Sequence, residues 1–506
     1  MENAVMTTVA SEASQKFGDA IALTLPGNES LTFKEIDLRA GQFAGGLLSL
    51  GISSGDRVVL YLPNGWEWIV AYHAIARLGA VVVPANILLS PDEVSYIASD
   101  SDARAVILPT DRLDQVEHTK GRLFIAPDGG DRGFGEVLSG HYLAPVARDP
   151  DDLFKIGYTS GTTGRPKGAM LTHANVFWSM ASTATVHVRH RSDVILSALP
   201  LPHVYGNIVM NSAMQSGARL VLLPRFEPAR ALELIAAEHV TLFDGVPTMY
   251  YQMLANPNIA TADLSSLNRC TVGGQTMPTA KMEAVVDRFG CPLLELWGMT
   301  EVAGPAVSHS PFWPARHGSI GLAFPAMEVR IASLEHPNDD ARNGEPGELM
   351  VRGPLVMKGY WNDPSATALV LDERGWLASG DVAVRDGDGY VFVVDRKKDM
   401  IITAGYNIYP AELEQVVAMH SGVAMVAVAG VPDEEKGEIA QAFVVLHAGV
   451  TLEEPELLLH CRQHLAAYKI PRRIAFVEDL PKTSTGKILR RTLREDARNQ
   501  STKPSA

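Results

Sequence analysis

The 506-residue sequence is short of cysteine, of uninterrupted apolar runs and of basic residues. Its three cysteines are too few, and odd in number, for a disulfide framework. The most apolar stretches, such as residues 68–87, are broken by His73, Arg77 and Pro84 and fall short of a membrane span. The N-terminus has no basic segment followed by a long apolar one, so we expect no signal peptide and a cytoplasmic protein. A peripheral membrane contact and a homodimer both stay open.

The shortage of basic residues gives the chain an acidic balance. There are 44 Lys and Arg against 58 Asp and Glu, a formal net charge of −14. This balance argues against nucleic acid as a partner. It also attracts anionic ligands poorly over long range, so the positive charge for any anionic substrate has to be local. The hydrophobic share of 46% is that of an ordinary globular protein, and the length indicates two or more domains.

Helix and strand patterns alternate along the first half of the chain, as in parallel sheets covered by helices. A capping box of Thr32 and Glu35 predicts a helix that runs to Leu50, and Ser90 with Glu93 predicts another. Further segments expected to be helices or strands are 58–62, 66–78, 80–83, 105–108, 194–199, 219–223, 228–238 and 240–243.

The pattern changes to short strands and turns from about Gly344. The Asp- and Gly-rich residues 384–396 predict a hairpin, and a small mixed α+β unit follows Asp395. We therefore place a domain boundary at residues 395–399. The elements expected in the last unit are a helix from Pro410, strands 424–431 and 439–446, a helix 455–465, a strand 473–477 and a terminal helix from Thr485.

The strongest local signal is the segment YTSGTTGRPKG at residues 158–168. Its glycines let backbone N–H groups approach a ligand, its hydroxyls add donors, and Arg165 and Lys167 add charge, which is the composition of a phosphate cradle. It is not a Walker A loop, because the residues after Gly161 lead to Pro166 and not to Gly-Lys-Ser/Thr. Composition alone leaves a surface turn as an equal alternative.

This segment resembles the signature loop of the adenylate-forming superfamily, which includes acyl- and aryl-CoA synthetases, peptide-synthetase adenylation domains and beetle luciferases. Other motifs similar to those of the family follow in order over nearly the whole chain. They are LPLPHVYG (199–206), VGGQTMP (272–278), ELWGMTE (295–301), GELMVRGPLVMKGYW (347–361), WLASGDVA (376–383), VVDRKKDMIITAGYNIYPAELE (393–414) and PKTSTGKILRR (481–491).

The resemblance implies an α/β fold in three parts. These are a large N-terminal domain of βαβ-type sheets with a β-barrel-like portion (1–394), a hinge (395–398) and a small mobile α+β C-terminal domain (399–506). It also implies a two-step reaction: a carboxylate attacks the α-phosphate of Mg·ATP to give an acyl-adenylate and pyrophosphate, and a thiol, usually that of CoA, then displaces AMP. Such chemistry asks the protein mainly to neutralise charge around the phosphorus.

The same resemblance assigns the nucleotide and metal sites. Thr300 would bind the α-phosphate, and Glu301 would hold Mg²⁺, a hard cation suited to a carboxylate. Asp381 would accept the ribose hydroxyls with help from Arg396, and Trp297, where many relatives carry Tyr, would stack on adenine unless it is simply a core residue. The other residues implied are Thr159, Ser160, Gly161, Thr162, Thr163, Gly164 and Lys167 for the β,γ-phosphates and Gly273, Gly274 and Gln275 for adenine.

Three residues are expected to act during catalysis or domain movement. Lys487 resembles the C-terminal lysine that bridges the carboxylate and the α-phosphate, a task for a flexible point charge; its alternative is a surface lysine. Lys398 matches the hinge position that absorbs the backbone rotation between the two steps. His203 lies where relatives carry a residue that gates the carboxylate, although a lone His is more often structural.

The acid and CoA sites are expected on opposite sides of the adenylate. The pocket for the acid contains no Lys or Arg among the residues that the resemblance implies, which favours an apolar fatty or aromatic acid; these residues are His203, Tyr205, Gly206, Val246, Gly298 and Met299, with the segment 207–214. Gly206 and Gly298 are expected to leave room for the substrate. For CoA, the resemblance and local charge favour Gly405, Tyr406, Lys469 and Arg472.

Between Lys469 and Arg494, eight basic residues stand against two acids. This segment would form an anion-binding face for the CoA phosphates, with a solvated basic helix end as an equal alternative for residues 490–494.

The sequence thus predicts an ATP-dependent, AMP-forming acyl-CoA ligase with ATP, Mg²⁺ and CoA, acting on a medium- or long-chain fatty acid. An aryl-CoA ligase is the second hypothesis, and a stand-alone adenylating enzyme that loads a carrier protein is the third. A catalytically silent nucleotide-binding protein is the alternative of a different class. It is disfavoured because Lys167, Glu301, Asp381 and Lys487 are all present.

Overall fold

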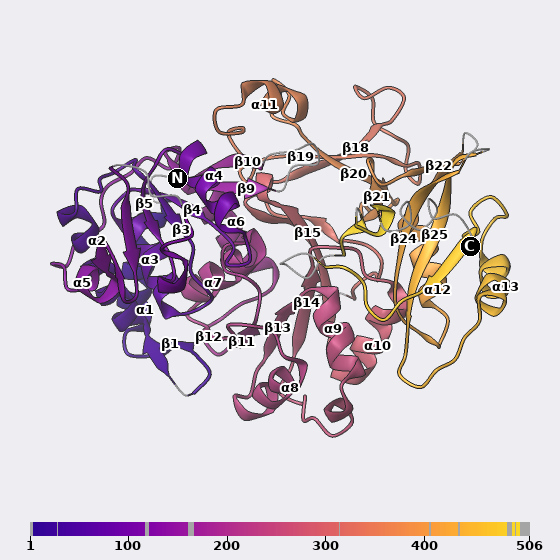
Figure 1. Cartoon of the computed structure of the whole chain (residues 1–506), viewed down its shortest axis with the longest axis horizontal. Helices are drawn as coiled ribbons and strands as arrows, with labels where there is room; N and C mark the ends of the chain where they lie inside the picture. Colours follow the sequence, from indigo (N-terminus) through magenta and orange to yellow (C-terminus); the bar gives the residue numbers. More distant parts are fainter. Residues whose placement is uncertain are drawn as a thin grey trace.

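The computed structural model describes residues 4–27, 29–116, 121–159, 166–312, 314–403, 406–433, 436–482, 488–490 and 492–495. Figure 1 shows a large N-terminal part, with the N-terminus at the left and strands β13–β15 in the centre, and a smaller C-terminal part at the right. The N-terminal part contains two large sheets and one small one.

The largest sheet has nine strands and is parallel from β1 to β15 in its centre, with antiparallel strands at both edges. In spatial order its strands are β17 (Leu322–Ala323), β16 (Gly304–Ser308), β15 (Leu293–Met299), β14 (Arg269–Gly273), β13 (Leu242–Gly245), β11 (Val194–Ser197), β12 (Arg219–Leu222), β1 (Ile21–Thr24) and β2 (Ser30–Thr32).

The second sheet has seven strands and is parallel except for the β9–β10 pair. Its order is β10 (Lys167–Thr172), β9 (Leu153–Thr159), β4 (Val81–Pro84), β3 (Arg57–Leu60), β5 (Ala103–Ile107), β6 (Leu123–Ala126) and β8 (Arg132–Gly133). The portion expected to be barrel-like is a four-stranded antiparallel sheet of β18 (Glu328–Ser333), β19 (Gly347–Arg352), β20 (Leu377–Arg385) and β21 (Val391–Arg396).

The C-terminal sheet contains β23 (Tyr406–Ile408), β22 (Ile401–Thr403), β25 (Gly437–Leu446) and β24 (Val423–Asp433) in that order, and β26 (Arg473–Phe476) pairs with β25. The helices are α1 (Val9–Phe17), α2 (Phe33–Ser49), α3 (Trp66–Arg77), α4 (Pro91–Asp100), α5 (Phe134–Leu138), α6 (His173–Val186), α7 (Val204–Ser216), α8 (Pro228–Ala237), α9 (Pro247–Ala255), α10 (Thr279–Phe289), α11 (Pro364–Val370), α12 (Pro410–Ala418) and α13 (Glu454–His464). Among the described residues, no helix has the length and apolar content to cross a membrane.

Local sequence signals account for the ends of several helices. The capping boxes predicted at α2 and α4 are confirmed: Thr32 and Ser90 each accept a hydrogen bond from the backbone N–H of Glu35 and Glu93, whose carboxylates accept in return. Gly51 follows α2 with φ +83°, a conformation that suits glycine. The terminal helix expected from Thr485 begins outside the described residues.

Buried apolar residues form separate cores on the two sides of residues 395–399. The main core draws on residues 6–391, whereas the two C-terminal cores draw on residues 401–465 and 427–493. This separation supports the domain boundary that we propose at 395–399, since each part can bury its own apolar surface.

Helices α6 and α7 lie between the two large sheets, since α6 contacts β9, β10 and β16 while α7 contacts β11, β12 and β16. One unexpected residue is buried on this side of the second sheet. The segment 153–156 looks mostly apolar, yet it contains Lys155, which is 1% exposed. Its ammonium donates to Asn207 Oδ1 at 3.2 Å, and Tyr72 donates to the same oxygen. Burial lowers the pKa of Lys155 to about 7.

We expect Lys155→Met to stabilise the protein, by about 2 kcal/mol at pH 6.5 and less at pH 9.5. The pKa of Lys155 is lower in the folded protein than in the unfolded chain, so the unfolded chain binds more protons between about pH 7 and about pH 10.5. The cost of burying Lys155 is therefore complete below pH 7 and disappears as the pH rises. Urea unfolding at both pH values measures the difference. The exposed Lys34→Met is the control, and equal effects of Lys155→Met at both pH values would contradict the prediction.

Candidate functional site

The predicted phosphate-binding segment, residues 158–168, includes the end of β9 and the start of β10. Thr159 ends β9 and pairs in register with Lys167, the first residue of β10. Residues 160–165, which include the predicted Ser160, Gly161, Thr162, Thr163 and Gly164, lie outside the described residues. The two ends of the segment are thus held side by side by strand pairing, which gives Thr159 and Lys167 a common position at the edge of the sheet.

Glu301 lies in a buried position next to this edge. It belongs to a short 3₁₀ turn after β15, and the residue is 6% exposed. The hydroxyl of Tyr360 donates to Glu301 Oε1 at 2.9 Å, and Lys167 Nζ lies 5.3 Å from the centre of the Tyr360 ring. Burial, followed by the charge of Glu301, raises the pKa of Tyr360, so the phenol stays protonated and donates. Tyr360 therefore contacts both the residue predicted to hold Mg²⁺ and a residue predicted to hold phosphate.

Thr300, the neighbour of Glu301, packs against the second sheet. A Cβ at Gly157 would lie 2.6 Å from the Thr300 methyl group, so glycine at this position of β9 allows Thr300 to approach. The predicted α-phosphate residue thus lies directly over the strand that leads into the phosphate segment.

Trp297 and Asp381 are joined by a hydrogen bond that the sequence did not reveal. The indole Nε1 of Trp297 donates to Asp381 Oδ2 at 2.7 Å, and the two residues are 7% and 8% exposed. Arg396 pairs with Asp381 in register across β20 and β21, and its Nε lies 3.4 Å from Asp381 Oδ1. The predicted adenine and ribose residues are therefore in contact. Trp297 orients the Asp381 carboxylate through its indole N–H, a donor that the Tyr of many relatives lacks.

The residues predicted to contact adenine lie at the end of β14 and directly after it. A Cβ at Gly273 would lie 2.3 Å from Leu296 Cδ1, and Gly274 has φ +95°, so both positions favour glycine. The side chain of Gln275 accepts a hydrogen bond from the backbone N–H of Ile488 at 3.0 Å. Lys487 itself lies outside the described residues, but the residue that follows it is held beside Gln275.

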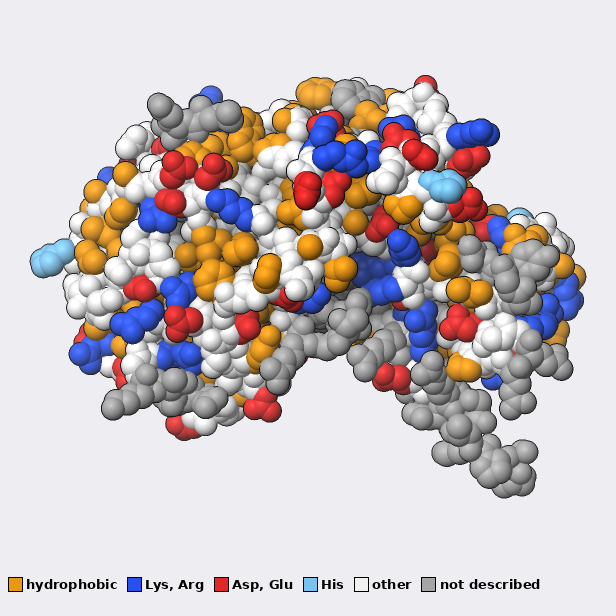
Figure 2. Space-filling view, turned by 90° about the horizontal axis from the view of Figure 1, so that it is seen from above, with side chains coloured by type: hydrophobic (Ala, Val, Ile, Leu, Met, Phe, Trp, Pro, Cys, Tyr) orange, Lys and Arg blue, Asp and Glu red, His pale blue; other side chains and the backbone are white. Residues whose placement is uncertain are grey.

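Thr279 and Lys281 of α10 also form hydrogen bonds with the C-terminal part. The backbone N–H of Thr279 donates to Gln415 Oε1 at 2.9 Å, and Lys281 Nζ donates to the carbonyl of Val423 at 2.6 Å. Figure 2 shows Lys and Arg side chains near the recess between the two parts of the molecule. The C-terminal part is thus fixed against the edge of the N-terminal part that carries Gln275.

Three of the residues predicted for the acid pocket, His203, Tyr205 and Gly206, lie at the start of α7. His203 caps this helix and accepts from the N–H of Tyr205, and Tyr205 and Val246 are buried. Gly206 and Gly298 were expected to leave room for the substrate, but the structure shows another reason for glycine at these two positions. A Cβ at Gly206 would lie 2.4 Å from the carbonyl oxygen of Pro200, and a Cβ at Gly298 would lie 2.0 Å from the carbonyl oxygen of Gly304. These glycines permit close backbone contacts rather than leaving open space; Met299, at the end of β15, is partly buried.

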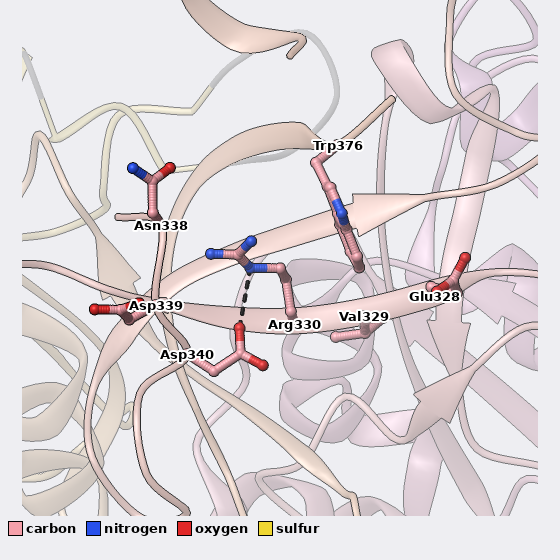
Figure 3. A pocket seen from close by; sticks show the side chains of 7 residues that line it. All are labelled: Glu328, Val329, Arg330, Asn338, Asp339, Asp340 and Trp376. Carbon is pink, nitrogen blue, oxygen red and sulfur yellow. Dashed lines mark ion pairs between the residues drawn. The ribbon is translucent and has the colours of Figure 1, made fainter. Parts of the chain in front are cut away.

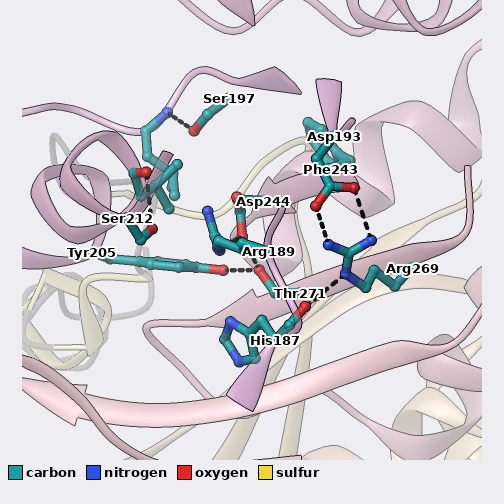
Figure 4. A network of polar contacts seen from close by, with 12 residues as sticks. His187, Arg189, Asp193, Ser197, Tyr205, Ser212, Phe243, Asp244, Arg269 and Thr271 are labelled. Carbon is teal, nitrogen blue, oxygen red and sulfur yellow. Dashed lines mark hydrogen bonds and ion pairs between the residues drawn. The ribbon is translucent and has the colours of Figure 1, made fainter. Parts of the chain in front are cut away.

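A buried polar network continues from Tyr205 into the nine-stranded sheet (Figure 4). Tyr205 and Thr271 share a hydrogen bond of 2.6 Å, Thr271 donates to Asp244 Oδ1 at 2.5 Å, and Arg189 Nη2 donates to the same oxygen at 2.8 Å. The side chains of Arg189 and Asp244 are fully buried. Arg189 Nε and Nη1 and Asp244 Oδ2 have no hydrogen-bond partner among the described residues. The residues predicted for the pocket include no Lys or Arg, but the network that begins at Tyr205 contains Arg189, whose charge Asp244 balances.

Several residues of the basic segment near the C-terminus pair with acids, most of which come from other segments. Lys469 Nζ contacts both oxygens of Glu412 at 2.6 and 2.8 Å. Lys482 pairs with Asp479, and Arg494 lies 3.7 Å from Asp399. Of the residues predicted to bind CoA, Arg472 is exposed, Lys469 is already paired, Gly405 lies outside the described residues, and only the backbone of Tyr406 is described. The local excess of positive charge in the sequence is therefore much smaller in the folded chain.

Arg490 is not a solvated helix end, contrary to the alternative expected for residues 490–494. It contacts Glu414 at 2.7 Å and lies 3.5 and 3.7 Å from Asp395 and Asp399. Burial raises the pKa of Asp395 to about 6, against the opposing effect of Arg490. In the sequence, the predicted hinge residue Lys398 lies between Asp395 and Asp399, whose carboxylates both lie near the Arg490 guanidinium.

One open groove of the described part is lined by residues of β18, of the loop after it and by the residue directly before β20 (Figure 3). It has a volume of about 640 Å³ and is lined by Glu328, Val329, Arg330, Asn338, Asp339, Asp340 and Trp376. None of these is a predicted site residue. Within the described residues, no group of three or more His, Cys, Asp or Glu is arranged to hold a metal ion.

Comparison with known proteins shows the family of the chain. Residues 10–361 match the AMP-binding enzyme family, and residues 412–487 match the AMP-binding enzyme C-terminal domain. The chain is 35% identical to a long-chain-fatty-acid–CoA ligase of Bacillus subtilis (strain 168), over 98% of this chain and 95% of that protein. It is 39% identical to a feruloyl-CoA synthase of an Amycolatopsis species, over 92% and 94%.

The solved structures include ATP-bound MatB from Rhodopseudomonas palustris, with a TM-score of 0.90, 29% identity and coverage of 98% of this chain and 99% of that one. The acyl-CoA ligases of this family use ATP, Mg²⁺ and CoA. The chain therefore belongs to the family of AMP-binding enzymes and is an AMP-forming acid–CoA ligase.

Proposed function

We propose that the chain activates a medium- or long-chain fatty acid as its acyl-adenylate and transfers the acyl group to CoA. The observation that supports the proposed site is the convergence of four segments: Lys167 at the start of β10, Glu301 after β15, Asp381 in β20 and Gln275 after β14. Lys167 and Glu301 both contact Tyr360, Asp381 accepts from Trp297, and Gln275 accepts from Ile488, the residue after Lys487. The four segments come from three sheets and meet only in the folded chain.

The proposed roles follow from the charges of these groups. Thr159 and Lys167 would hold the β,γ-phosphates, Thr300 the α-phosphate, and Asp381 with Arg396 the ribose. Glu301 fits Mg²⁺, because it is a buried carboxylate fixed by a phenol; Mg²⁺ usually takes one or two carboxylates and completes its shell with phosphates and water. When bound, Mg²⁺ would neutralise charge on the phosphates. His203 would face the carboxylate, and Lys487 would reach the α-phosphate.

A fatty acid is the first candidate for the substrate. The long-chain-fatty-acid–CoA ligases of several bacteria are 35–36% identical to this chain over 93–98% of its length. The charge of Arg189 is balanced by Asp244, so the described pocket region does not call for a second carboxylate. An acid with an apolar body suits these surroundings.

An oxygen-substituted aryl acid is the second candidate. The spare N–H groups of Arg189 lie behind Tyr205 in the buried network, and buried donors require an acceptor. A hydroxyl or methoxy group on a short aromatic acid would supply one. The 39% identity to feruloyl-CoA synthase favours the same candidate. Transfer to a carrier protein in place of CoA is the third hypothesis.

A substrate panel tests these proposals. We expect AMP release to require CoA for full turnover and to be fastest with fatty acids of medium or long chain. AMP release at an equal rate without CoA would contradict CoA as the acceptor and favour a carrier protein. Fastest turnover with a hydroxycinnamate- or benzoate-like acid would replace the fatty acid by the aryl candidate.

A further inference from the structure

Tyr360 connects two groups that are far apart in the sequence and that the proposed function assigns to one ligand. Its hydroxyl donates to Glu301 Oε1 at 2.9 Å, and its ring lies 5.3 Å from Lys167 Nζ. A cation within about 6 Å of a ring centre is attracted by the ring. Tyr360 is 9% exposed, so neither contact is weakened by free access of water.

The backbone around Tyr360 is fixed to the same two segments. Residues 358–361 pair with β10 as an additional short strand: Met170 N donates to the carbonyl of Gly359 at 2.9 Å, and Trp361 N donates to the carbonyl of Gly168 at 2.7 Å. Tyr360 faces Ala169 in this pairing. Because side chains alternate along a strand, Lys167 is on the same side of β10 as Ala169.

The other end of this short segment is fixed to the turn that carries Glu301. The backbone N–H of Met357 donates to the carbonyl of Glu301 at 2.8 Å, and the N–H of Tyr360 donates to Thr367 Oγ1 of α11 at 2.8 Å. The Tyr360 side chain therefore has little freedom, and its two polar contacts are set by the backbone.

We propose that Tyr360 is a positioning residue that sets the Glu301 carboxylate and the Lys167 ammonium at a fixed separation for a magnesium–triphosphate ligand. The proposal rests on the proposed roles of Glu301 and Lys167. The hydroxyl donates to one oxygen of Glu301 and so restricts the orientation of the carboxylate, whereas the ring supports the lysine from the side. Hydrogen bonds to metal-binding carboxylates commonly affect metal affinity by about 10–100-fold.

Two variants separate the two contacts. Tyr360→Phe keeps the ring beside Lys167 and removes the hydrogen bond to Glu301, whereas Tyr360→Leu removes both. Tyr61→Phe is the matched control, because it removes the hydroxyl of another buried tyrosine, one that donates to the backbone carbonyls of Ile87 and Leu89. Calorimetry with a non-hydrolysable ATP analogue over a series of Mg²⁺ concentrations is the first readout, and the thermal midpoint without ligand is the second.

For Tyr360→Phe, we expect the Mg²⁺ concentration for half-maximal binding to rise by about tenfold, with near-normal binding at saturating Mg²⁺ and an unchanged thermal midpoint. For Tyr360→Leu, we expect analogue binding to stay about threefold or more weaker even at saturating Mg²⁺, because the lysine loses its support. Tyr61→Phe should match the unmodified protein. In a Glu301→Gln background, Tyr360→Phe should add no further change in Mg²⁺ dependence.

The opposite results overturn the proposal. Equal weakening of binding by Tyr360→Phe at every Mg²⁺ concentration, with a lowered thermal midpoint, would indicate a structural role only. Unchanged Mg²⁺ dependence in Tyr360→Phe would show that its hydroxyl does not position Glu301. If the unmodified protein binds the analogue independently of Mg²⁺, the proposed role of Glu301 fails instead, which distinguishes the two failures.

Discussion

Lys487→Ala is expected to lose adenylation by about 10²–10³-fold while it still converts supplied acyl-adenylate and CoA to the thioester. The proposed contribution of Lys487 is positive charge at the α-phosphate, which is needed only while the phosphorus is attacked. The hydrogen bond between Ile488 and Gln275 holds the neighbouring residue at the proposed adenine site, which supports this role in the first step. Release of pyrophosphate measures the first step, and thioester formation from synthetic acyl-adenylate measures the second.

Lys482→Ala is the control for this prediction. Lys482 lies in the same motif but is engaged by Asp479, so its loss should change neither step appreciably. Equal loss of both steps in Lys487→Ala would contradict the division of labour. Equal loss of adenylation in Lys487→Ala and Lys482→Ala would show that adenylation depends on the total positive charge of the motif and not on Lys487 in particular.

Arg189→Met is expected to lower the free energy of unfolding by about 3–5 kcal/mol, because it leaves Asp244 buried without its counter-ion. The double variant Arg189→Met/Asp244→Leu should recover most of this loss, since two apolar side chains can replace a buried pair. A residual cost of about 1 kcal/mol remains, because Thr271 loses its acceptor on Asp244. Urea unfolding of the single and double variants measures the coupling.

The exposed pair of Arg132 and Glu136 provides the comparison. Arg132→Met should change the free energy of unfolding by no more than about 0.5 kcal/mol, because solvent screens this pair. If Arg189→Met also changes stability by so little, then water or another group reaches Asp244 in the folded protein. If the two substitutions at Arg189 and Asp244 are additive, the pair does not act as a unit.

Much of the secondary structure could be predicted because its causes are local. The capping boxes of α2 and α4 depend on residues three positions apart, and the hairpin of β20 and β21 depends on one Asp- and Gly-rich turn. The burial of Lys155 could not be predicted in this way. A single charged residue inside an apolar run predicts an exposed position, yet the packing of α7 against the sheet encloses it.

The residues of the candidate site were proposed from sequence motifs, whereas their contacts could not be predicted. Sequence motifs identified Lys167, Glu301, Trp297 and Asp381, but the bond from Trp297 to Asp381 joins β15 to β20, which belong to different sheets. Nothing in the spacing of the two motifs indicates that an indole N–H meets that carboxylate. Tyr360 belongs to the motif at residues 347–361, but its contacts with Glu301 and Lys167 are visible only in the folded chain.

The family of the enzyme, the order of many of its elements and most of its candidate site residues could be inferred from the chain without its fold. They follow from short motifs, whose chemistry and spacing are properties of neighbouring residues. Which charges act together became visible only in the folded chain. The basic segment at residues 469–494 looked like an anion-binding face, but Glu412, Glu414, Asp395 and Asp399 approach it from elsewhere in the chain. Electrostatic interactions depend on distance in space, and distances between remote segments are set by the packing of the whole fold.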